Sequence, residues 1–353
     1  PLKFDIKSID RNFRNSINKS EFSFEQNDNE YFEKILSKNI IQDLPLIYLE
    51  GYKEFSKISK SYYINNINVT LTAQNSYNYN SLFNFWYAEN FKKISLIVMQ
   101  HGGNNCTHKL ALEEIHWSLA KEVWTFGASN GENEIPMFQY NCSMYIKTFQ
   151  KKVKNKKEVK KILLIITSTS KFLRQFGSGM VTEEILVHIE NTILFLKNLS
   201  SDTDVTIRLP NIDYGWSLKE RILNSSYKCN VMFDDKSKNI LLSLRNHDIC
   251  VTNYIGSSFI EAISLNFPVA ALVNKNFEII HDNFKKTFED LYNNHIVFFN
   301  PNDLASFLNK PDLNFNLKSN ERVKCLSEFK KNYARTSSVW MFEWIKRLNS
   351  LNN

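Results

Sequence analysis

The chain has 353 residues, which is long for one hydrophobic core, so we expect two domains of ordinary size. Hydrophobic residues make up 43% of the sequence and aromatic residues 14%, a composition that excludes a disordered chain. No uncharged apolar stretch approaches the roughly 18 residues of a membrane-spanning helix, and the polar N-terminus is not that of a signal peptide. Five scattered cysteines without a CxxC pair indicate reduced thiols in a cytoplasmic protein and no zinc knuckle.

The formal charge of +7 is concentrated in one short run. The stretch KKVKNKKEVKK at 151–161 carries seven lysines and one glutamate, a net charge of +6 that leaves +1 for the rest of the chain. Nucleic-acid-binding domains spread their positive charge over a folded face, so we expect no nucleic-acid partner. The run is either a solvated linker or an electrostatic contact with an anionic membrane surface.

Apolar runs alternate with amphipathic stretches beyond a polar, Asn-rich segment at 1–42, which we interpret as a peripheral helical arm. We predict strands at 44–50, 68–73 and 93–100, and helices at 81–93 and 110–123. This alternation is a βαβ pattern, which predicts a parallel sheet and a first Rossmann-like domain at 43–150.

The same alternation restarts after the basic segment 151–160, which we interpret as a linker. We predict strands at 161–168, 204–210, 247–254 and 267–274, and helices at 182–199, 257–266 and 320–348. A second Rossmann-like, nucleotide-binding domain at 161–314 follows from this pattern, with C-terminal helices at 315–353 that pack back across both domains. Open parallel sheets bind ligands beyond the carboxyl ends of their strands, where the motifs below all fall.

Two adjacent glycines mark the first motif, MQHGGNNCTH, between a strand and a helix. Gly102 and Gly103 allow positive φ and a close backbone approach, so the N–H groups of this loop can bind an anion. His101 can donate a hydrogen bond to a phosphate or a carboxylate. A plain glycine turn is the alternative. In the helix that follows, one of Glu113 and Glu114 should face a cleft, unless both are surface residues.

Two further loops follow strands. TSTSKFLRQFGSGM contains Arg174, which can bind a carboxylate or phosphate through two parallel hydrogen bonds, unless this is an ordinary flexible loop. In TIRLPNIDYGW, Arg208 lies within the strand, where an unpaired charge is costly, and should reach a partner near the strand end. Asp213 follows in a loop with Tyr214 and Trp216 as walls. The alternative is that its carboxylate closes an Asx turn.

The last motif, TNYIGSSFIEAISLNFP, places a glycine and two serines between a strand and a helix. Ser257 and Ser258 should cap the helix, and their hydroxyls with the positive helix end make a seat for a phosphate. Glu261 is expected in the first helical turn, where it can bond a ribose hydroxyl. A plain helix cap is the alternative. No set of histidines, cysteines and carboxylates has metal-ligand spacing, and DTD at 202–204 precedes a strand, so we interpret it as a turn.

In order along the chain, the sequence contains NSYNYNSLFNFWYAE, QHGGN, a helix with EE-H, RLPNIDYGW, TNYIGSSFIEAISLNFPVAALVN and YARTSSVWMFEW. These motifs, spread over residues 43–345, resemble the bacterial surface-carbohydrate transferase family first described in leptospiral genomes. That family is similar to the retaining β-Kdo transferases of glycosyltransferase family 99. The resemblance implies an α/β fold of GT-B type, with two Rossmann-like domains facing across a cleft and a C-terminal helix packing back.

The resemblance also implies a CMP-activated ulosonic acid donor such as CMP-Kdo, used without a metal or other cofactor to build lipopolysaccharide O-antigen or another surface glycan. Retention by double displacement needs a carboxylate nucleophile, for which we expect Asp213, with Glu114 as the acid/base. The expected donor-binding residues are His101, Gly102, Gly103, Asn104, Arg174, Arg208, Tyr214, Trp216, Asn253, Ser257, Ser258 and Glu261.

Within this set, Ser257, Ser258 and Glu261 are expected at the CMP phosphate and ribose. The segment 101–103, with Arg174 or Arg208, is expected at the sugar carboxylate. The acceptor is expected to be a lipid-linked glycan, reached at the inner face of the cytoplasmic membrane. Two alternatives stay open, a GT-B transferase for another CMP- or UDP-sugar and a catalytically dead glycan-binding module.

Overall fold

The computed structural model of the chain describes residues 14, 30–64, 67–73, 81–109, 117–150, 161–171, 182–235, 239–275 and 279–351. Internal contacts divide the chain into two compact units, Pro1–Leu96 and Ile97–Asn353. This division falls inside the stretch expected to form the first Rossmann-like domain. The expected domain boundaries themselves stay a prediction.

The first unit is held together by aromatic packing. Its elements are α2 (Glu30–Asp43), the 3-10 helix η3 (Leu46–Tyr48), α3 (Tyr52–Tyr62), β1 (Val69–Ala73), α5 (Ser81–Asn90) and the start of β2 (Ser95–Met99). The ring of Phe85 on α5 is buried, with Tyr48, Tyr52 and Phe55 around it at centroid distances of 5.4, 5.2 and 4.9 Å. These contacts hold α3 and η3 against α5.

The strand predicted at 44–50 is wrong. Residues Leu46–Tyr48 form η3, in which the Tyr48 N–H donates to the Pro45 carbonyl at 2.9 Å, and none of the three residues is buried. Tyr48 stacks on Phe85 with an angle of 4° between the ring planes. The short apolar run therefore covers its apolar surface by stacking on a helix, and it does not enter a sheet.

The second unit contains the rest of β2 and a longer alternation of strands and helices. These elements are β3 (Glu122–Thr125), β4 (Glu134–Pro136), α7 (Tyr140–Gln150), β5 (Lys161–Ile165), α8 (Thr182–Asn198), β6 (Asp204–Arg208), α9 (Leu218–Leu223), β7 (Asn230–Phe233), α10 (Ile240–Leu244), β8 (Ile249–Thr252), α11 (Ser257–Ser264), β9 (Val269–Leu272), η4 (Asp282–Phe284), α12 (Lys285–Asn293), β10 (Val297–Phe298), α13 (Pro301–Leu308), α14 (Leu313–Leu317), α15 (Asn320–Tyr333) and α16 (Trp340–Leu351). No helix among the described residues is long and apolar enough to cross a membrane.

The strands form two sheets. The smaller has the order β1-β2-β3-β4, in which β2 pairs with β3 and β3 with β4 in parallel. The larger has the order β10-β9-β8-β5-β6-β7, with parallel pairing throughout. Its strand order reverses at β5, between β6 on one side and β8 on the other. The expected α/β fold with parallel sheets is confirmed, whereas the arrangement of two domains across a cleft stays a prediction.

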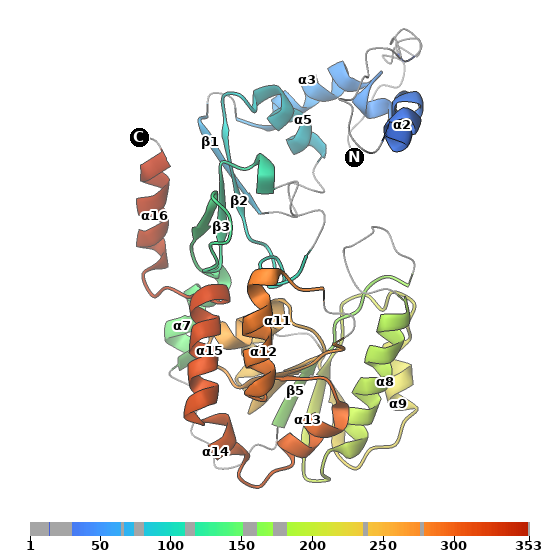
Figure 1. Cartoon of the computed structure of the whole chain (residues 1–353), viewed down its shortest axis with the longest axis vertical. Coiled ribbons are helices and arrows are strands. Elements are labelled where there is room, and N and C mark those ends of the chain that lie inside the picture. Colours follow the sequence, from blue (N-terminus) through green and yellow to red (C-terminus); the bar gives the residue numbers. More distant parts are fainter. Residues whose placement is uncertain are drawn as a thin grey trace. The chain divides into compact units, whose positions relative to one another are not determined.

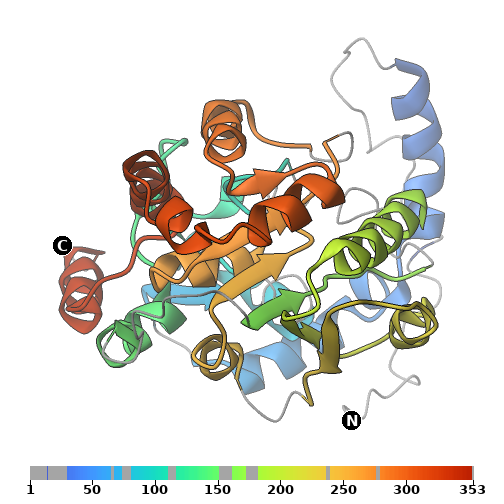
Figure 2. The ribbon, with the colours of Figure 1, turned by 90° about the horizontal axis from the view of Figure 1, so that it is seen from below.

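Helices cover both faces of the six-stranded sheet (Figures 1 and 2). Alternate residues of β5 enter opposite buried clusters, Leu163 and Ile165 one cluster and Ile162 and Leu164 the other. The first cluster joins the sheet to α7, α11, α12 and α15, and the second joins it to α8, α9 and α13. Because both faces are covered, the polar loops at the strand ends are the open part of this layer.

The helix predicted at 110–123 is too long, because residues 122–125 form β3. Residues 110–116 lie outside the described part of the chain. The helix was predicted because the apolar residues of this stretch recur at helical spacing, a pattern that does not show the role of Glu122. Its buried carboxylate instead forms an ion pair with Arg347, 225 residues away, and accepts the indole N–H of Trp124 at 2.9 Å.

The C-terminal segment forms two helices where the sequence predicted one. α15 ends at Tyr333, and the chain then bonds to other parts of the unit, with Arg335 N–H donating to the Phe126 carbonyl at 2.8 Å and Ser337 N–H to Ser143 Oγ at 3.1 Å. These tertiary hydrogen bonds replace the helical ones. The following helix, α16, packs against α7, so part of the expected packing back is confirmed (Figure 1).

Candidate functional site

A polar cavity of about 130 Å³ lies at the carboxyl ends of β5 and β8. Its walls come from the end of β5, the loop between β8 and α11, and the loop after β2. The lining residues are Asn104, Ile165, Thr167, Thr252, Asn253, Tyr254, Gly256, Ser257 and Ser258. Because β5 and β8 are the neighbours at which the strand order reverses, the cavity occupies the place where open α/β sheets bind their ligands.

The N-terminus of α11 opens into this cavity. Gly256 occupies the N-cap position, and no described side chain caps the helix. The expected capping by Ser257 and Ser258 is therefore wrong, because these serines are the first two helical residues. The first turn contains no acidic residue, so its N–H groups and the partial positive charge of the helix end are available to an anion.

The loop after β2 packs directly on the start of α11. The N–H of Gly103 donates to Ser257 Oγ at 3.3 Å. A Cβ on residue 103 would lie 2.6 Å from the carbonyl carbon of Gly256, so a larger residue would force the two backbones apart. The sequence predicted that the backbone at the glycine pair is closely approached, and the group that approaches it is the backbone of the loop at Gly256. Neither Gly102 nor Gly103 has a positive φ.

Two amide side chains without a predicted role shape this loop. Gln100, 4% exposed, donates to the Gly102 carbonyl at 2.8 Å and accepts from the Phe126 N–H at 2.7 Å. The Oδ1 of Asn105 accepts the Gly102 N–H at 2.8 Å. Both N–H groups of the glycine pair are therefore bonded within the protein. Gln100 could have been predicted as a residue that shapes this loop, because it is a polar residue at the end of an apolar strand.

Asn253 joins the tips of β5 and β8. Its Oδ1 accepts the Thr167 N–H at 2.8 Å, and its Nδ2 donates to the Thr167 carbonyl at 3.2 Å. Asn253 is 3% exposed, so its amide fixes the backbone of one cavity wall. Tyr254 follows Asn253 in the loop between β8 and α11. Its ring leaves no space for a side chain at residue 256, because a Cβ on Gly256 would lie 2.2 Å from a ring carbon. Thr167 and Tyr254 were not predicted as site residues.

Asp213 is exposed and is held in a local network after β6. Its two carboxylate oxygens accept the N–H groups of Ser217 at 2.9 Å and Leu218 at 3.2 Å. The sequence left an Asx turn, bonded two residues on, as the alternative; the carboxylate instead closes a longer loop, four and five residues on, at the start of α9. Asp213 is not among the residues that line the cavity. Its role as nucleophile stays a prediction.

The loop that holds Asp213 has an uncommon backbone. Tyr214, Gly215 and Ser217 have φ values of 54°, 86° and 51°. Trp216 is 3% exposed and donates its indole N–H to the Thr169 carbonyl at 2.8 Å, so it packs inward, whereas Tyr214 is 39% exposed. Positive φ at bulky residues is rare and is concentrated at functional loops.

Arg208 and Glu261 lie near one another beside the sheet end. Arg208 pairs with Asp234 at 2.8 Å and donates to Ser243 Oγ at 3.2 Å, so Asp234 is the partner expected near the strand end. Glu261 lies beyond the first turn of α11, which corrects its predicted place. Burial raises the pKa of the Glu261 carboxyl to about 7, while the Arg208 charge lowers it. No described group hydrogen-bonds to this carboxylate.

The structure brings only part of the predicted site together. The predicted residues that meet at the cavity are Asn104, Asn253, Ser257 and Ser258, with Gly103 behind Ser257. His101 is exposed in the same loop. Glu113, Glu114 and Arg174 lie outside the described residues, as does the segment 151–160.

A family model described as "LIC12162 family transferase" matches residues 3–348. The chain belongs to the LIC12162 family of transferases. No curated protein matches it. Membership of the LIC12162 family identifies the reaction class as group transfer.

Solved structures similar to this LIC12162 family member include the wall teichoic acid polymerase TagF, with 12% identity over 85% of each chain and a TM-score of 0.45. Acinetobacter baumannii MurG has 9% identity over 85% of this chain and 79% of its own, with a TM-score of 0.48. S. aureus MnaA, solved with UDP, has 11% identity over 85% of this chain and 78% of its own, with a TM-score of 0.48. Similarities at this level assign neither a ligand nor a reaction.

Proposed function

We propose that this transferase moves Kdo from CMP-β-Kdo to a surface-glycan acceptor, with retention of configuration. The observation that carries the proposal is the polar cavity at the point where the strand order of the six-stranded sheet reverses. It combines a helix N-terminus with serine hydroxyls, the chemistry that holds a nucleotide phosphate. Family membership supplies the reaction class, and the ordered motifs of the sequence supply the Kdo donor.

In this proposal the CMP phosphate binds at Ser257 and Ser258. When the glycosidic bond to CMP breaks, negative charge grows on the departing phosphate. The positive end of α11 is fixed in advance and stabilises that charge without a metal ion or other cofactor. Asn253 keeps the opposite wall in place through its two hydrogen bonds to Thr167.

Glu261 is the proposed partner of the ribose. It lies one helical turn beyond Ser257, so the two residues share a face of α11. A partly buried carboxylate without a described hydrogen-bond partner is costly, and two ribose hydroxyls would supply the missing donors. Arg208, close enough to lower the pKa of Glu261, is proposed to face the sugar carboxylate together with His101 or Arg174.

Asp213 is the proposed nucleophile and Glu114 the acid/base of a double displacement. In the first step, an Asp213 oxygen bonds to the anomeric carbon as the bond to the CMP oxygen breaks. In the second, the acceptor hydroxyl gives up its proton to Glu114 and displaces the aspartate. A carboxylate has about four acceptor positions, so the two N–H bonds to Asp213 leave lone pairs for attack.

The wider setting is also part of the proposal. Two Rossmann-like domains would face one another across a cleft in the GT-B manner, with the acceptor on the N-terminal side. The acceptor would be a lipid-linked precursor of lipopolysaccharide O-antigen or capsule, met at the cytoplasmic face of the membrane. The lysine-rich run 151–161 would add an electrostatic contact with anionic lipid.

One observation favours a second candidate, a glycan-binding module without catalysis. Both oxygens of Asp213 already accept N–H groups at the start of α9, which is a sufficient structural reason for an aspartate at this position. In that case the cavity would bind a nucleotide sugar or glycan and leave it intact.

A donor panel separates these candidates. CMP-Kdo, CMP-sialic acid and several UDP-hexoses are incubated with the protein, and the released nucleotide is measured, followed by intact-mass spectrometry. We expect release from CMP-Kdo and a covalent Kdo adduct that is absent from Asp213→Ala. Preference for a UDP-sugar would overturn the donor, an unmodified mass during turnover would overturn double displacement, and no release from any donor would favour the non-catalytic module.

A further inference from the structure

The outer face of α16 exposes a group of large apolar side chains. None of the twelve residues of this helix is buried. Met341, Phe342 and Ile345 are 58%, 68% and 53% exposed, and Val339, just before the helix, is 56% exposed. The spacing of the three helical residues places them on one side of α16. Single exposed apolar residues are ordinary, but a group on one helix face marks an interaction surface.

The opposite face of α16 packs against the rest of the unit, and this packing keeps the apolar face exposed to solvent. Trp340 and Trp344 both pack on the ring of Tyr140 of α7, at centroid distances of 5.4 and 5.3 Å. One turn further along α16, Arg347 forms an ion pair with the Glu122 carboxylate of β3. Both ribbon views place α16 beside α7 at the edge of the unit (Figures 1 and 2).

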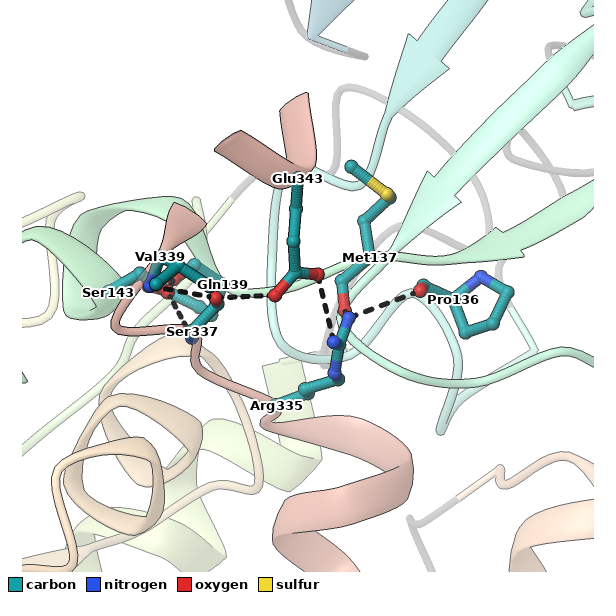
Figure 3. Close-up of polar contacts among 8 residues, drawn as sticks. All are labelled: Pro136, Met137, Gln139, Ser143, Arg335, Ser337, Val339 and Glu343. Carbon is teal, nitrogen blue, oxygen red and sulfur yellow. Dashed lines mark hydrogen bonds and ion pairs between the residues drawn. The ribbon is translucent and has the colours of Figure 1, made fainter. Parts of the chain in front are cut away.

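A further set of polar contacts, shown in Figure 3, fixes the N-terminal end of α16. Arg335 donates to Glu343 at 2.8 Å and to the Met137 carbonyl at 3.0 Å. The other oxygen of Glu343 accepts the Ser337 hydroxyl. Glu343 is the only acidic residue in the sequence of α16, and it is neutralised by this pairing.

The neighbouring helix α7 also exposes an apolar side chain. Met144 is 44% exposed and lies one turn beyond Tyr140, on the side that meets α16. Lys147 of α7 and Lys346 of α16 are also exposed, and α7 contains no acidic residue. The two helices therefore present apolar side chains with lysines and without an unpaired carboxylate. In the sequence, α7 is followed at once by the lysine-rich run.

We propose that the outer faces of α16 and α7 dock on an anionic lipid surface. Apolar side chains with flanking lysines are the composition that binds the interface of a negatively charged bilayer, where the apolar groups enter the headgroup region and the lysines meet lipid phosphates. Self-association explains the surface less well, because a two-fold contact would bury lysines of both copies in one interface while neither helix offers an unpaired carboxylate to them. The proposal does not depend on the sugar donor.

Vesicle sedimentation of the full chain tests this surface. The protein is mixed with phosphatidylcholine vesicles, with or without phosphatidylglycerol, as wild type and as Phe342→Ser/Ile345→Ser. A matched control, Leu186→Ser/Leu194→Ser, removes two leucines of α8 that are 38% and 44% exposed. Thermal unfolding midpoints confirm that all three proteins are folded, and CMP-Kdo cleavage in solution reports separately on the proposed reaction.

We expect wild type and the α8 control to sediment with anionic vesicles and not with neutral ones. The apparent affinity of the α16 variant should fall at least about tenfold, while its cleavage activity stays that of wild type. Equal sedimentation of both variants would overturn the proposal, and so would a wild type that stays in the supernatant. Light scattering that showed a wild-type dimer split by the α16 substitutions would assign the face to a second copy instead.

Discussion

Gly103 and Ser257, 154 residues apart in sequence, are in direct contact through a hydrogen bond of 3.3 Å from the glycine N–H to the serine hydroxyl. The contact sets the loop after β2 against the N-terminus of α11 and closes one side of the polar cavity. It depends on the absence of side chains at residues 103 and 256. The shape of the cavity therefore rests on two glycines, of which Gly256 also lines it.

Gly103→Ala should destabilise the protein and weaken CMP binding together. Its Cβ would meet backbone atoms of Gly256 at 2.6 Å, and overpacking of this kind costs about 1–3 kcal/mol. Gly131→Ala is the control, because its nearest neighbour, 3.3 Å away, is the movable end of the Glu134 side chain. Urea unfolding and calorimetric titration with CMP measure the two effects. Equal stabilities of the two variants would show that the loops move apart freely.

Asn253→Ala should lower the affinity for CMP by loosening the cavity wall at Thr167. The substitution removes both side-chain bonds to the Thr167 backbone and leaves a partly buried N–H without this partner, at a cost of about 1 kcal/mol of stability. The exposed Asn293→Ala should change stability by less than about 0.5 kcal/mol. A CMP affinity in Asn253→Ala equal to that of wild type would show that this wall does not shape the nucleotide site.

Glu261 should make stability depend on pH in the range between its two pKa values. Its carboxyl has a pKa of about 7 in the folded protein and about 4.3 when unfolded. Below the lower value it is protonated in both states. Between the two values the unfolded chain releases its proton and the folded chain keeps it, so stability falls as the pH rises from about 4.3 to about 7, by up to about 3 kcal/mol in total.

Unfolding free energies from pH 5 to 8 test this expectation. Relative to Glu261→Gln, the wild type should lose stability as the pH rises, because the glutamine never ionises. The exposed Glu190→Gln should run parallel to the wild type. If the wild-type and Glu261→Gln curves were parallel, the carboxylate would be better solvated than its surroundings indicate. Saturating CMP should reduce the difference, because ribose hydroxyls would satisfy the ionised oxygens.

Two substitutions at Asp213 separate the structural role of its carboxylate from a chemical one. Asparagine keeps one oxygen, which can replace one of the two oxygens that accept from Ser217 and Leu218, so Asp213→Asn should lose less stability than Asp213→Ala, which should lose about 1–2 kcal/mol. Both should lose sugar transfer by at least about a thousandfold, since an amide cannot serve as the nucleophile. If the loss of activity in Asp213→Asn were no larger than its loss of stability explains, the carboxylate would have only the loop-closing role.

The elements around the cavity were predictable because their signals are local. β5, β8 and β9 are buried apolar runs, and α11 starts at a glycine followed by two serines, so the sequence alone predicted strand–loop–helix units with polar tips. By contrast, β3 contains Glu122, whose buried carboxylate is explained only by Arg347 at the far end of the chain. Local periodicity carries no information about such a partner.

The site could be predicted as a set of motifs but not as a geometry. The sequence placed Gly103 and Ser257 in separate loops, and nothing in either motif shows that one serves as the hydrogen-bond partner of the other. The same limit applies to Asp213, for which the sequence left a turn-closing role and a chemical role open. Gln100 was overlooked because its function is to shape the loop, through bonds to Gly102 and Phe126.

The most direct test of the central claim, that the cavity beside α11 holds the nucleotide phosphate, is amide hydrogen exchange of the full chain with and without CMP. Bound phosphate should accept hydrogen bonds from the first N–H groups of α11 and tighten the loop that rests on them. We predict slower exchange in peptides that cover residues 253–261 and 100–108. Saturating CMP that slowed exchange only elsewhere in the chain would contradict the account.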